Sequence, residues 1–256
     1  MLAHLVIVLL VGVVLGAPAG EIEIQEPDNG LATAYEQAGD HFQGDIVLTD
    51  IQADAVESGR TALIGPQYMW PDRIVYYTIR AGDFSLSQIT SIKQAVEQIS
   101  LVSCIKFVER TNQKDYVLVT GENTGCWSYL GRRGNSQELN LQPVGCMSRG
   151  TIIHEFLHAL GFVHMQSASD RDFYISVDWN NIQTGRSTNF DRYASSIIND
   201  FGIPYDYESV MHYGKTAFSK NGLPTIIPFD KTVNIGQRVG MSYKDIKRLN
   251  SLYTCN

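Results

Sequence analysis

The stretch that decides the fold is HEFLHALGFVH, from His154 to His164, in a chain of 256 residues. On a helix, His154 and His158 lie one turn apart on one face, so their imidazoles can bind one metal ion together. Glu155 can reach water at that ion without binding the ion itself. Gly161 can adopt a left-handed backbone that ends the helix and returns His164 as a third ligand. Three imidazoles that leave a fourth position open are typical of a catalytic zinc site.

The apolar pattern outside this stretch predicts both strands and helices. Strands are predicted at 73–79, 105–109, 116–120 and 138–141. Helices are predicted from Ser85 to about residue 99, at 149–160 and at 242–253. After Asp172 the pattern loosens, and irregular structure is expected there.

The charge of the chain is unevenly distributed. Residues 1–60 contain ten acidic residues and one basic residue, whereas residues 61–256 contain 17 acidic and 19 basic residues. Hydrophobic residues make up 44% of the chain and charged residues 18%, which is typical of a globular protein. Because no basic block is long enough to follow a phosphate backbone, we expect no nucleic-acid partner.

The N-terminal residues predict export. An apolar run from Leu5 to Leu15, broken only by Gly12, has the length of a signal-peptide core and is too short to span a bilayer. We therefore expect a signal peptide at 1–16 and a secreted, extracellular protein without a membrane anchor; a buried helix or strand is the alternative. The polar, acidic residues that follow, up to about residue 60, are typical of a pro-segment or a mobile linker.

The chain contains four cysteines, at Cys104, Cys126, Cys146 and Cys255. An even number in an exported chain predicts two disulfides, and the absence of CxxC spacing disfavours a structural zinc ribbon. Three pairings are open. A bond between Cys126 and Cys146 would close a local loop, and one between Cys104 and Cys255 would tie the C-terminal end to the first helix.

A second motif, SVMHY at Ser209 to Tyr213, places Met211 47 residues after His164. HExxHxxGFxH followed by SxMHY resembles the astacin family of secreted zinc metalloendopeptidases, within the metzincins. The resemblance covers about residues 61–256, including 65–70, 170–172 and 235–238. It implies a two-lobed α+β protease domain, with a twisted N-terminal sheet, an active-site helix and an irregular C-terminal lobe.

The resemblance also implies which residues bind the metal ion and which turn lies beneath them. His154, His158 and His164 would bind one Zn2+ per chain, and Tyr213 would be an additional ligand that swings away to stabilise the transition state. A buried aromatic is the alternative for Tyr213. Met211 would lie in the turn beneath the histidines, which is compatible with ordinary core packing.

Arg238 resembles the basic residue that favours acidic side chains just after the scissile bond, and a surface salt bridge is its alternative. The strand at 138–141 would be an exposed edge on which an extended peptide pairs. The spacing of the four cysteines matches the family pattern, and the resemblance therefore implies the pairs Cys104–Cys255 and Cys126–Cys146.

The acidic residues that follow the signal peptide, 17–60, are called the acidic segment below. They contain a third motif that matches the family. Phe42-Gln43-Gly44-Asp45 resembles the FxGD element of the family, whose aspartate takes the zinc position reserved for water. The resemblance implies that 17–60 is an inhibitory pro-segment, that Asp45 binds zinc in the zymogen only, and that an activating protease trims the chain near Arg60. A Gly-Asp turn in a flexible segment is the alternative.

Two positions depart from the family pattern. The residue after the third histidine is usually Glu and here is Met165, and three positions later the usual Arg is Ala168. In the family that Glu pairs with the new amino terminus. The departure leaves open how the mature N-terminus is anchored here.

The predicted function is therefore that of a secreted zinc metalloendopeptidase acting on protein or peptide substrates, expected to be a monomer. Glu155 would act as the general base toward water, as in other zinc hydrolases. The alternative is a catalytically silent, secreted zinc-binding protein of the same fold.

Overall fold

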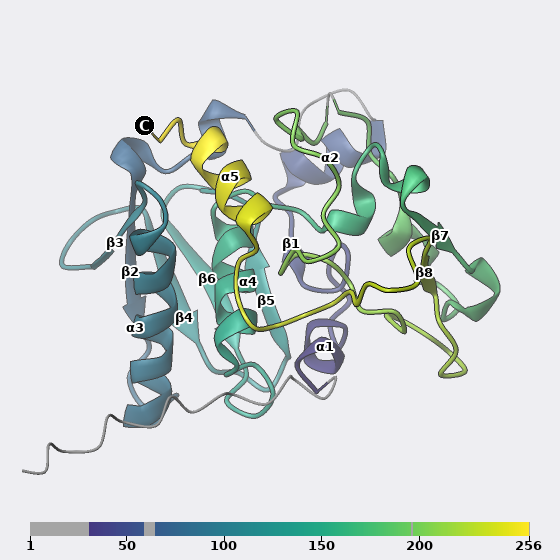
Figure 1. Cartoon of the computed structure of the whole chain (residues 1–256). Helices are drawn as coiled ribbons and strands as arrows, with labels where there is room; N and C mark the ends of the chain where they lie inside the picture. The colour runs from purple at the N-terminus through teal and green to yellow at the C-terminus, as the bar shows by residue number, and fades with distance from the viewer. Residues whose placement is uncertain (1–30, 59–64, 196, 256) are drawn as a thin grey trace, which may run out of the picture.

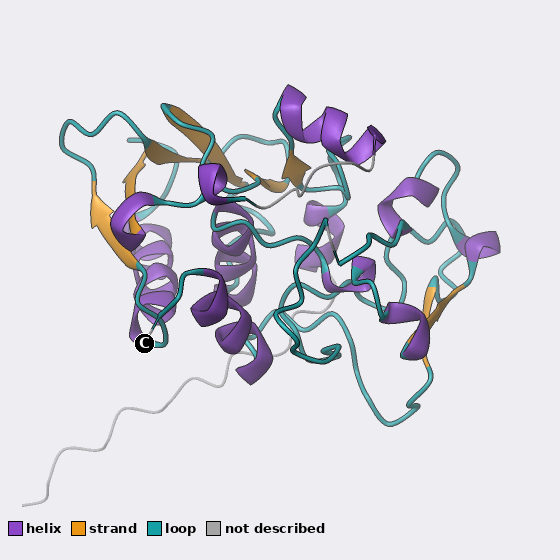
Figure 2. Ribbon diagram, turned by 90° about the horizontal axis from the view of Figure 1, so that it is seen from above, coloured by secondary structure: helices purple, strands orange, loops and turns teal. Residues whose placement is uncertain are grey.

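The computed structural model describes residues 31–58, 65–195 and 197–255; the predicted signal peptide lies outside these residues. The N-terminal lobe holds a twisted six-stranded sheet with two long helices on one face, and the C-terminal lobe consists mainly of loops and short turns (Figure 1, Figure 2). This confirms the two-lobed α+β fold. No helix among the described residues is long and apolar enough to cross a membrane.

The α-helices of the described residues are α1 (Leu31–Glu36), α2 (Asp50–Ser58), α3 (Leu86–Leu101), α4 (Arg149–Ala159) and α5 (Tyr243–Leu252). The strands are β1 (Ile46–Val47), β2 (Ile74–Ile79), β3 (Lys106–Glu109), β4 (Tyr116–Thr120), β5 (Cys126–Tyr129), β6 (Ser136–Leu141), β7 (Ile175–Val177) and β8 (Ile226–Pro228). The predicted strands correspond to β2, β3, β4 and β6, and the predicted helices to α3, α4 and α5. After Asp172 the strands of the described residues are the short pair β7 and β8, as the loose pattern suggested.

Helix boundaries follow from capping side chains. Ser85 accepts the backbone N–H of Gln88, and the Gln88 side chain returns to the Ser85 N–H, which is a capping box at the start of α3. Ser242 and Asp245 form the same arrangement at the start of α5. These reciprocal bonds satisfy backbone donors that a helix start otherwise leaves free.

The sheet has the strand order β1-β5-β6-β4-β2-β3, and every pair is parallel except β5 with β6. The expectation that 138–141 forms an exposed edge is wrong, because β6 is paired on both sides, with β4 and with β5. The strand β5, which the sequence analysis did not predict, lies outside β6. Its outer side is covered by β1, which pairs Ile46 with Ser128 and Val47 with Tyr129.

Helix α4 lies in the middle of the molecule, against β5, β6 and α3 (Figure 1). Every residue from Gly150 to Ala159 is buried, as expected for a core helix. On its sheet side Phe156 packs edge-on against Phe107 and Tyr77. This packing fixes the position from which the histidines project.

Residues 31–58 are packed against both lobes, so the mobile-linker alternative is wrong for this part of the acidic segment. Ile46 is fully buried beside Leu130. From α2, the buried Gln52 donates its side-chain amide to the Leu130 carbonyl at 3.0 Å.

Two disulfides join the pairs Cys104–Cys255 and Cys126–Cys146, which is the pairing implied by the resemblance. The first bond ties the chain just after α5 to the loop after α3. The second bond joins β5 to the loop that leads into α4. Both therefore brace elements that surround the central helix.

Candidate active site

Helix α4 presents His154 and His158 from successive turns. Its start is fixed by Ser148, whose hydroxyl accepts the backbone N–H of Thr151 at 3.2 Å. The Nε2 atoms of the two histidines lie 3.0 Å apart. The helix therefore brings both rings to one point, as the one-turn spacing predicts.

Gly161 turns the chain after α4. Its φ is +104°, in the region that favours glycine, and its N–H donates to the His158 carbonyl at 2.8 Å. The chain then returns so that the His164 Nε2 lies 3.2 Å from the His154 Nε2. Three imidazoles thus converge on a single point.

Each of the three histidines uses its other nitrogen, Nδ1, in a hydrogen bond to a carbonyl oxygen. For His154, His158 and His164 in turn, the acceptors are Val210 O at 2.8 Å, Phe162 O at 2.7 Å and Gln43 Oε1 at 2.9 Å. A proton held on Nδ1 leaves the Nε2 lone pair free to bind a metal. Burial lowers the pKa of His154 and lowers that of His164 to about 3, so both rings are neutral.

Asp45 completes the set of donor atoms. Its Oδ2 lies 3.3 Å from the Nε2 of both His154 and His164, and its Oδ1 lies 3.5 Å from the Nε2 of His158. Zinc held tetrahedrally by ligands about 2.0–2.1 Å away spaces those ligands about 3.3 Å apart. The four buried donors therefore fit one zinc ion in number, chemistry and spacing.

Glu155 lies beside these donors without joining them. Both carboxylate oxygens are buried, and neither has a hydrogen-bond partner among the described residues. Burial, together with the negative charges of Asp45 and Glu36, raises the pKa of Glu155 well above its ordinary value. A buried carboxyl group without a structural partner is what a general base requires, because it must be free to take a proton.

The turn at 209–213 lies beneath the histidines. Met211 is buried, and its carbonyl accepts the Met165 N–H at 2.9 Å. Asp245, the capping residue of α5, accepts the Ser209 hydroxyl at 2.6 Å and the Val210 N–H at 2.9 Å. Asp245 therefore positions the turn, a role that the sequence analysis missed.

Tyr213 lies outside the four-donor cluster in this structure. Its hydroxyl donates to the backbone carbonyl of Gln43, and its ring lies 4.5 Å from the His164 ring, centroid to centroid. The Tyr213 side chain is thus next to the metal site, but its hydroxyl is held by the hydrogen bond to Gln43 of the acidic segment. Gln43 also bonds His164, a double contact that the FxGD pattern does not specify.

Arg238 is buried, so the alternative of a surface salt bridge is wrong. Its guanidinium pairs with both carboxylate oxygens of Glu36, at 2.7 and 2.6 Å. Its backbone passes so close to Gly150 that a Cβ there would lie 2.0 Å from the Arg238 carbonyl carbon. The sequence analysis missed the contact between Glu36 and Arg238, because the two residues lie 202 positions apart in the chain.

Met165 and Ala168 are buried in an apolar cluster of the C-terminal lobe that also includes Ile175 and Ile226. The position that follows the third histidine is thus surrounded by apolar side chains. Residues 59–64, where trimming was expected, lie outside the described residues.

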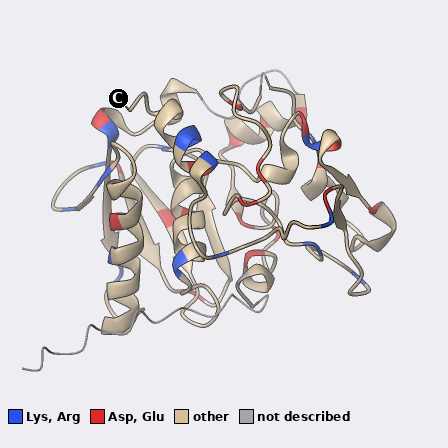
Figure 3. Cartoon of the chain, viewed as in Figure 1, with Lys and Arg blue, Asp and Glu red and all other residues tan. Residues whose placement is uncertain are grey.

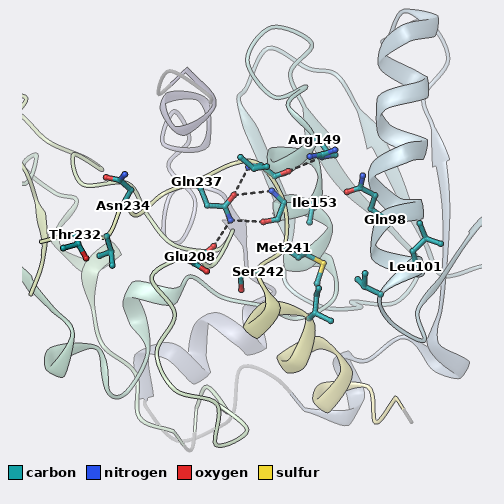
Figure 4. A pocket seen from close by; sticks show the side chains of 15 residues that line it. Gln98, Leu101, Arg149, Ile153, Glu208, Thr232, Asn234, Gln237, Met241 and Ser242 are labelled. Carbon is teal, nitrogen blue, oxygen red and sulfur yellow. Dashed lines mark hydrogen bonds between the residues drawn. The ribbon is translucent and has the colours of Figure 1, made fainter. Parts of the chain in front are cut away.

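The part of the acidic segment from Glu36 to Val47 makes the contacts at the metal site, through Glu36, Gln43 and Asp45, and pairs with β5. A groove of about 920 Å3 lies elsewhere, between α3, α4, α5 and the loop 232–241 (Figure 4). Its lining includes none of the predicted site residues. Acidic and basic residues are interspersed along residues 65–255, whereas residues 31–58 contain acidic residues and no Lys or Arg (Figure 3).

Two histidines on one helix, a third histidine after the turn that follows it, and an adjacent glutamate define the class of mononuclear zinc peptidase sites. The family model for Astacin, a family of peptidases, matches residues 62–254, and the chain belongs to this family.

Several known proteins are similar to this chain in sequence. Zinc metalloproteinase nas-14 of Caenorhabditis elegans is 44% identical over 192 residues, 74% of this chain and 38% of that protein. Meprin A subunit beta of Rattus norvegicus is 38% identical over 245 residues, 94% of this chain and 34% of that protein. The chain thus spans well under half the length of these two relatives.

High choriolytic enzyme 1 of Oryzias latipes is 44% identical over 184 residues, 71% of this chain and 66% of that protein. The solved structure of that protein, described as a hatching enzyme zinc-protease, covers 78% of this chain and 96% of its own, with 40% identity and a TM-score of 0.68. The comparison agrees with the fold described above.

Proposed function

We propose that this chain is a secreted, zinc-dependent endopeptidase that hydrolyses protein or peptide bonds and is made as a zymogen. The observation that carries the proposal is the convergence of three imidazoles at 3.0–3.2 Å next to a buried Glu155 whose carboxylate has no hydrogen-bond partner among the described residues. Family membership and the names of the relatives support the same conclusion. The substrates are proteins or peptides, by analogy with those relatives.

Each residue of the site is proposed to have a separate role in the reaction. His154, His158 and His164 would hold zinc, which when bound polarises the scissile carbonyl and makes water more acidic. Glu155 takes a proton from the attacking water and passes it to the leaving nitrogen. Tyr213, once released from Gln43, donates its hydroxyl to the developing oxyanion.

Residues 17–60 are proposed to be the pro-segment, and 61–256 the catalytic domain. Asp45 takes the ligand position that the reaction needs for water, and β1 covers the outer edge of β5. The rat meprin match covers more of the chain than residues 61–256 can supply, so part of the upstream segment is shared with that relative. An activating protease would cut near Arg60 and release both contacts.

Metal analysis and a cleavage-site profile test this proposal together. The full chain should contain about one zinc per molecule, and the trimmed chain should cut internal peptide bonds in a library of unblocked and end-blocked peptides. Zinc binding without turnover would identify a silent zinc-binding protein of this fold instead.

Tyr213→Phe is expected to lower kcat of the trimmed protein by about 10- to 100-fold with little change in KM, because the lost hydrogen bond forms only in the transition state. Tyr253→Phe is the matched control, since its buried hydroxyl also donates to a carbonyl, that of Leu160, at 3.1 Å. Steady-state kinetics on one peptide separates the two constants. An unchanged kcat with a raised KM would reject the proposed role of Tyr213.

The apolar surroundings of Met165 predict tolerance of the exact N-terminal residue. Burying an unpaired ammonium group beside Met165 would be costly, so a new amino terminus is expected to stay in water or to pair with another acid. Trimmed forms beginning at Ser58, Gly59, Thr61 and Leu63 should agree within a few-fold in kcat/KM and a few degrees in melting temperature. A sharp optimum at one start residue would contradict this.

A further inference from the structure

The acidic segment makes a second buried carboxylate contact besides that of Asp45. We propose that Glu36 is a second inhibitory anchor, which occupies the Arg238 pocket beside the metal site and keeps the uncleaved chain silent together with Asp45. The proposal rests on the proposed function, because it concerns how the same cleft is regulated. It concerns Glu36 itself, which lies outside the FxGD element.

The contact has the form of ligand recognition rather than of a surface ion pair. Glu36 is the last residue of α1, and its two oxygens accept from Nε and Nη2 of Arg238 at 2.7 and 2.6 Å. The side chains are 4% and 1% exposed, respectively. A planar guanidinium that meets a carboxylate in this two-point way fixes both distance and orientation.

Arg238 also makes contacts of its own with the rest of the lobe, besides those with Glu36. The remaining amino group, Nη1, donates to the backbone carbonyls of His212 at 3.2 Å and Gln237 at 2.9 Å. The Gln237 side chain in turn joins the loop to the carbonyls of Glu208 and Gly240 (Figure 4). These contacts use Nη1 and leave Nε and Nη2 for the carboxylate of Glu36.

The pocket lies directly beside the reacting centre. A carboxylate oxygen of Glu36, a ring nitrogen of His154 and a carboxylate oxygen of Glu155 all lie within 4.8 Å of one another. An acidic side chain bound to Arg238 therefore excludes any substrate side chain from the position next to Glu155. Occupation of this pocket blocks the cleft independently of the metal ligand position.

The two anchors are joined by a short, tightly fitted loop. At Gly44 the φ is +93°, and a Cβ there would lie 2.9 Å from the Glu36 carbonyl and 2.8 Å from the Phe218 ring. Gln37 accepts the Phe218 N–H at 2.7 Å. Because Glu36 and Asp45 are tethered closely, binding of either carboxylate raises the effective concentration of the other.

Hydrogen exchange on the full, uncleaved chain tests this anchor without relying on activity. Glu36→Gln keeps the size of the side chain and removes its charge. We expect amide exchange in residues 31–47 to accelerate by about tenfold or more, because the buried Arg238 loses its counter-charge. Asp40→Asn is the matched control, because it removes the same charge four residues later. Asp40 is 96% exposed and its ion pair with Arg186 lies at the surface, so exchange should change less than about twofold.

The variants Arg238→Gln and Glu36→Gln/Arg238→Gln complete a double-mutant cycle. If the pair is the anchor, the double variant should exchange no faster in residues 31–47 than the faster single variant. Exchange in residues 66–255 should stay as in the wild type, except at Ser128, Leu130 and Phe218, whose N–H groups are bonded to residues 37–47. Unchanged exchange in Glu36→Gln, additive effects in the cycle, or loosening of both parts of the chain would each overturn the proposal.

A peptidase assay of the same preparations separates this inference from the proposed function. Uncleaved Glu36→Gln should show activity at least about tenfold above uncleaved wild type, matching the change in exchange. If trimmed wild type cuts nothing while the exchange results hold, the proposed function fails and the anchor stands. If trimmed wild type is active but uncleaved Glu36→Gln is as silent and as protected as wild type, the anchor fails.

Discussion

Glu155→Gln is expected to lower kcat/KM of the trimmed protein by about 10²- to 10⁴-fold while leaving its zinc content unchanged. The amide has nearly the shape of the carboxylate but cannot accept the proton of the attacking water. The three imidazoles and their Nδ1 partners do not involve Glu155, so metal binding should persist. Peptide hydrolysis and metal analysis on the same preparation measure the two quantities.

The matched control is Glu97→Gln, the same substitution at an exposed position on α3. It should alter neither activity nor zinc content, because surface substitutions of this kind are usually close to neutral. Near-normal proteolysis by Glu155→Gln would reject Glu155 as the general base. Loss of zinc in that variant would show that the glutamate helps to hold the metal.

Asp45→Ala is expected to give an uncleaved chain that already has peptidase activity. The substitution removes the carboxylate that lies 3.3 Å from both His154 and His164, and so opens the ligand position that water needs. We expect the uncleaved chain to gain peptidase activity by at least about tenfold, since each 1.4 kcal/mol of lost anchoring free energy is a factor of ten. The gain is measured on a small peptide substrate, with the length of the chain checked by mass spectrometry.

Two comparisons make this test specific. Asp54→Ala removes a carboxylate from the exposed face of α2 and should leave the zymogen silent. Trimmed Asp45→Ala should match trimmed wild type, because Asp45 has then been removed from both. An uncleaved Asp45→Ala chain as silent as wild type would show that latency depends on other contacts.

The metal ligands could be predicted because their geometry is local. HExxH places two side chains one helical turn apart, and Gly161 provides the left-handed turn that returns His164. Helices α3 and α5 were predictable for the same reason, since their capping boxes lie within four consecutive residues.

The contacts that were missed or misassigned are all between distant parts of the chain. The edge position expected for 138–141 failed because a strand pattern does not specify its neighbours, and β5 is only four residues long. Glu36 lies in a short helix with no motif, and only the fold brings it to Arg238, 202 residues later. Likewise, nothing near Gln43 in the sequence shows that it bonds both His164 and Tyr213.

The most direct test of the central claim follows casein cleavage by one preparation before trimming, after trimming, after zinc removal by a chelator, and after zinc is restored. A metal-dependent endopeptidase held silent by its pro-segment should cut casein only in the second and fourth states, at internal bonds identified by mass spectrometry. Cleavage that persists after complete zinc removal, or none in any state although the trimmed chain binds zinc, would contradict the account.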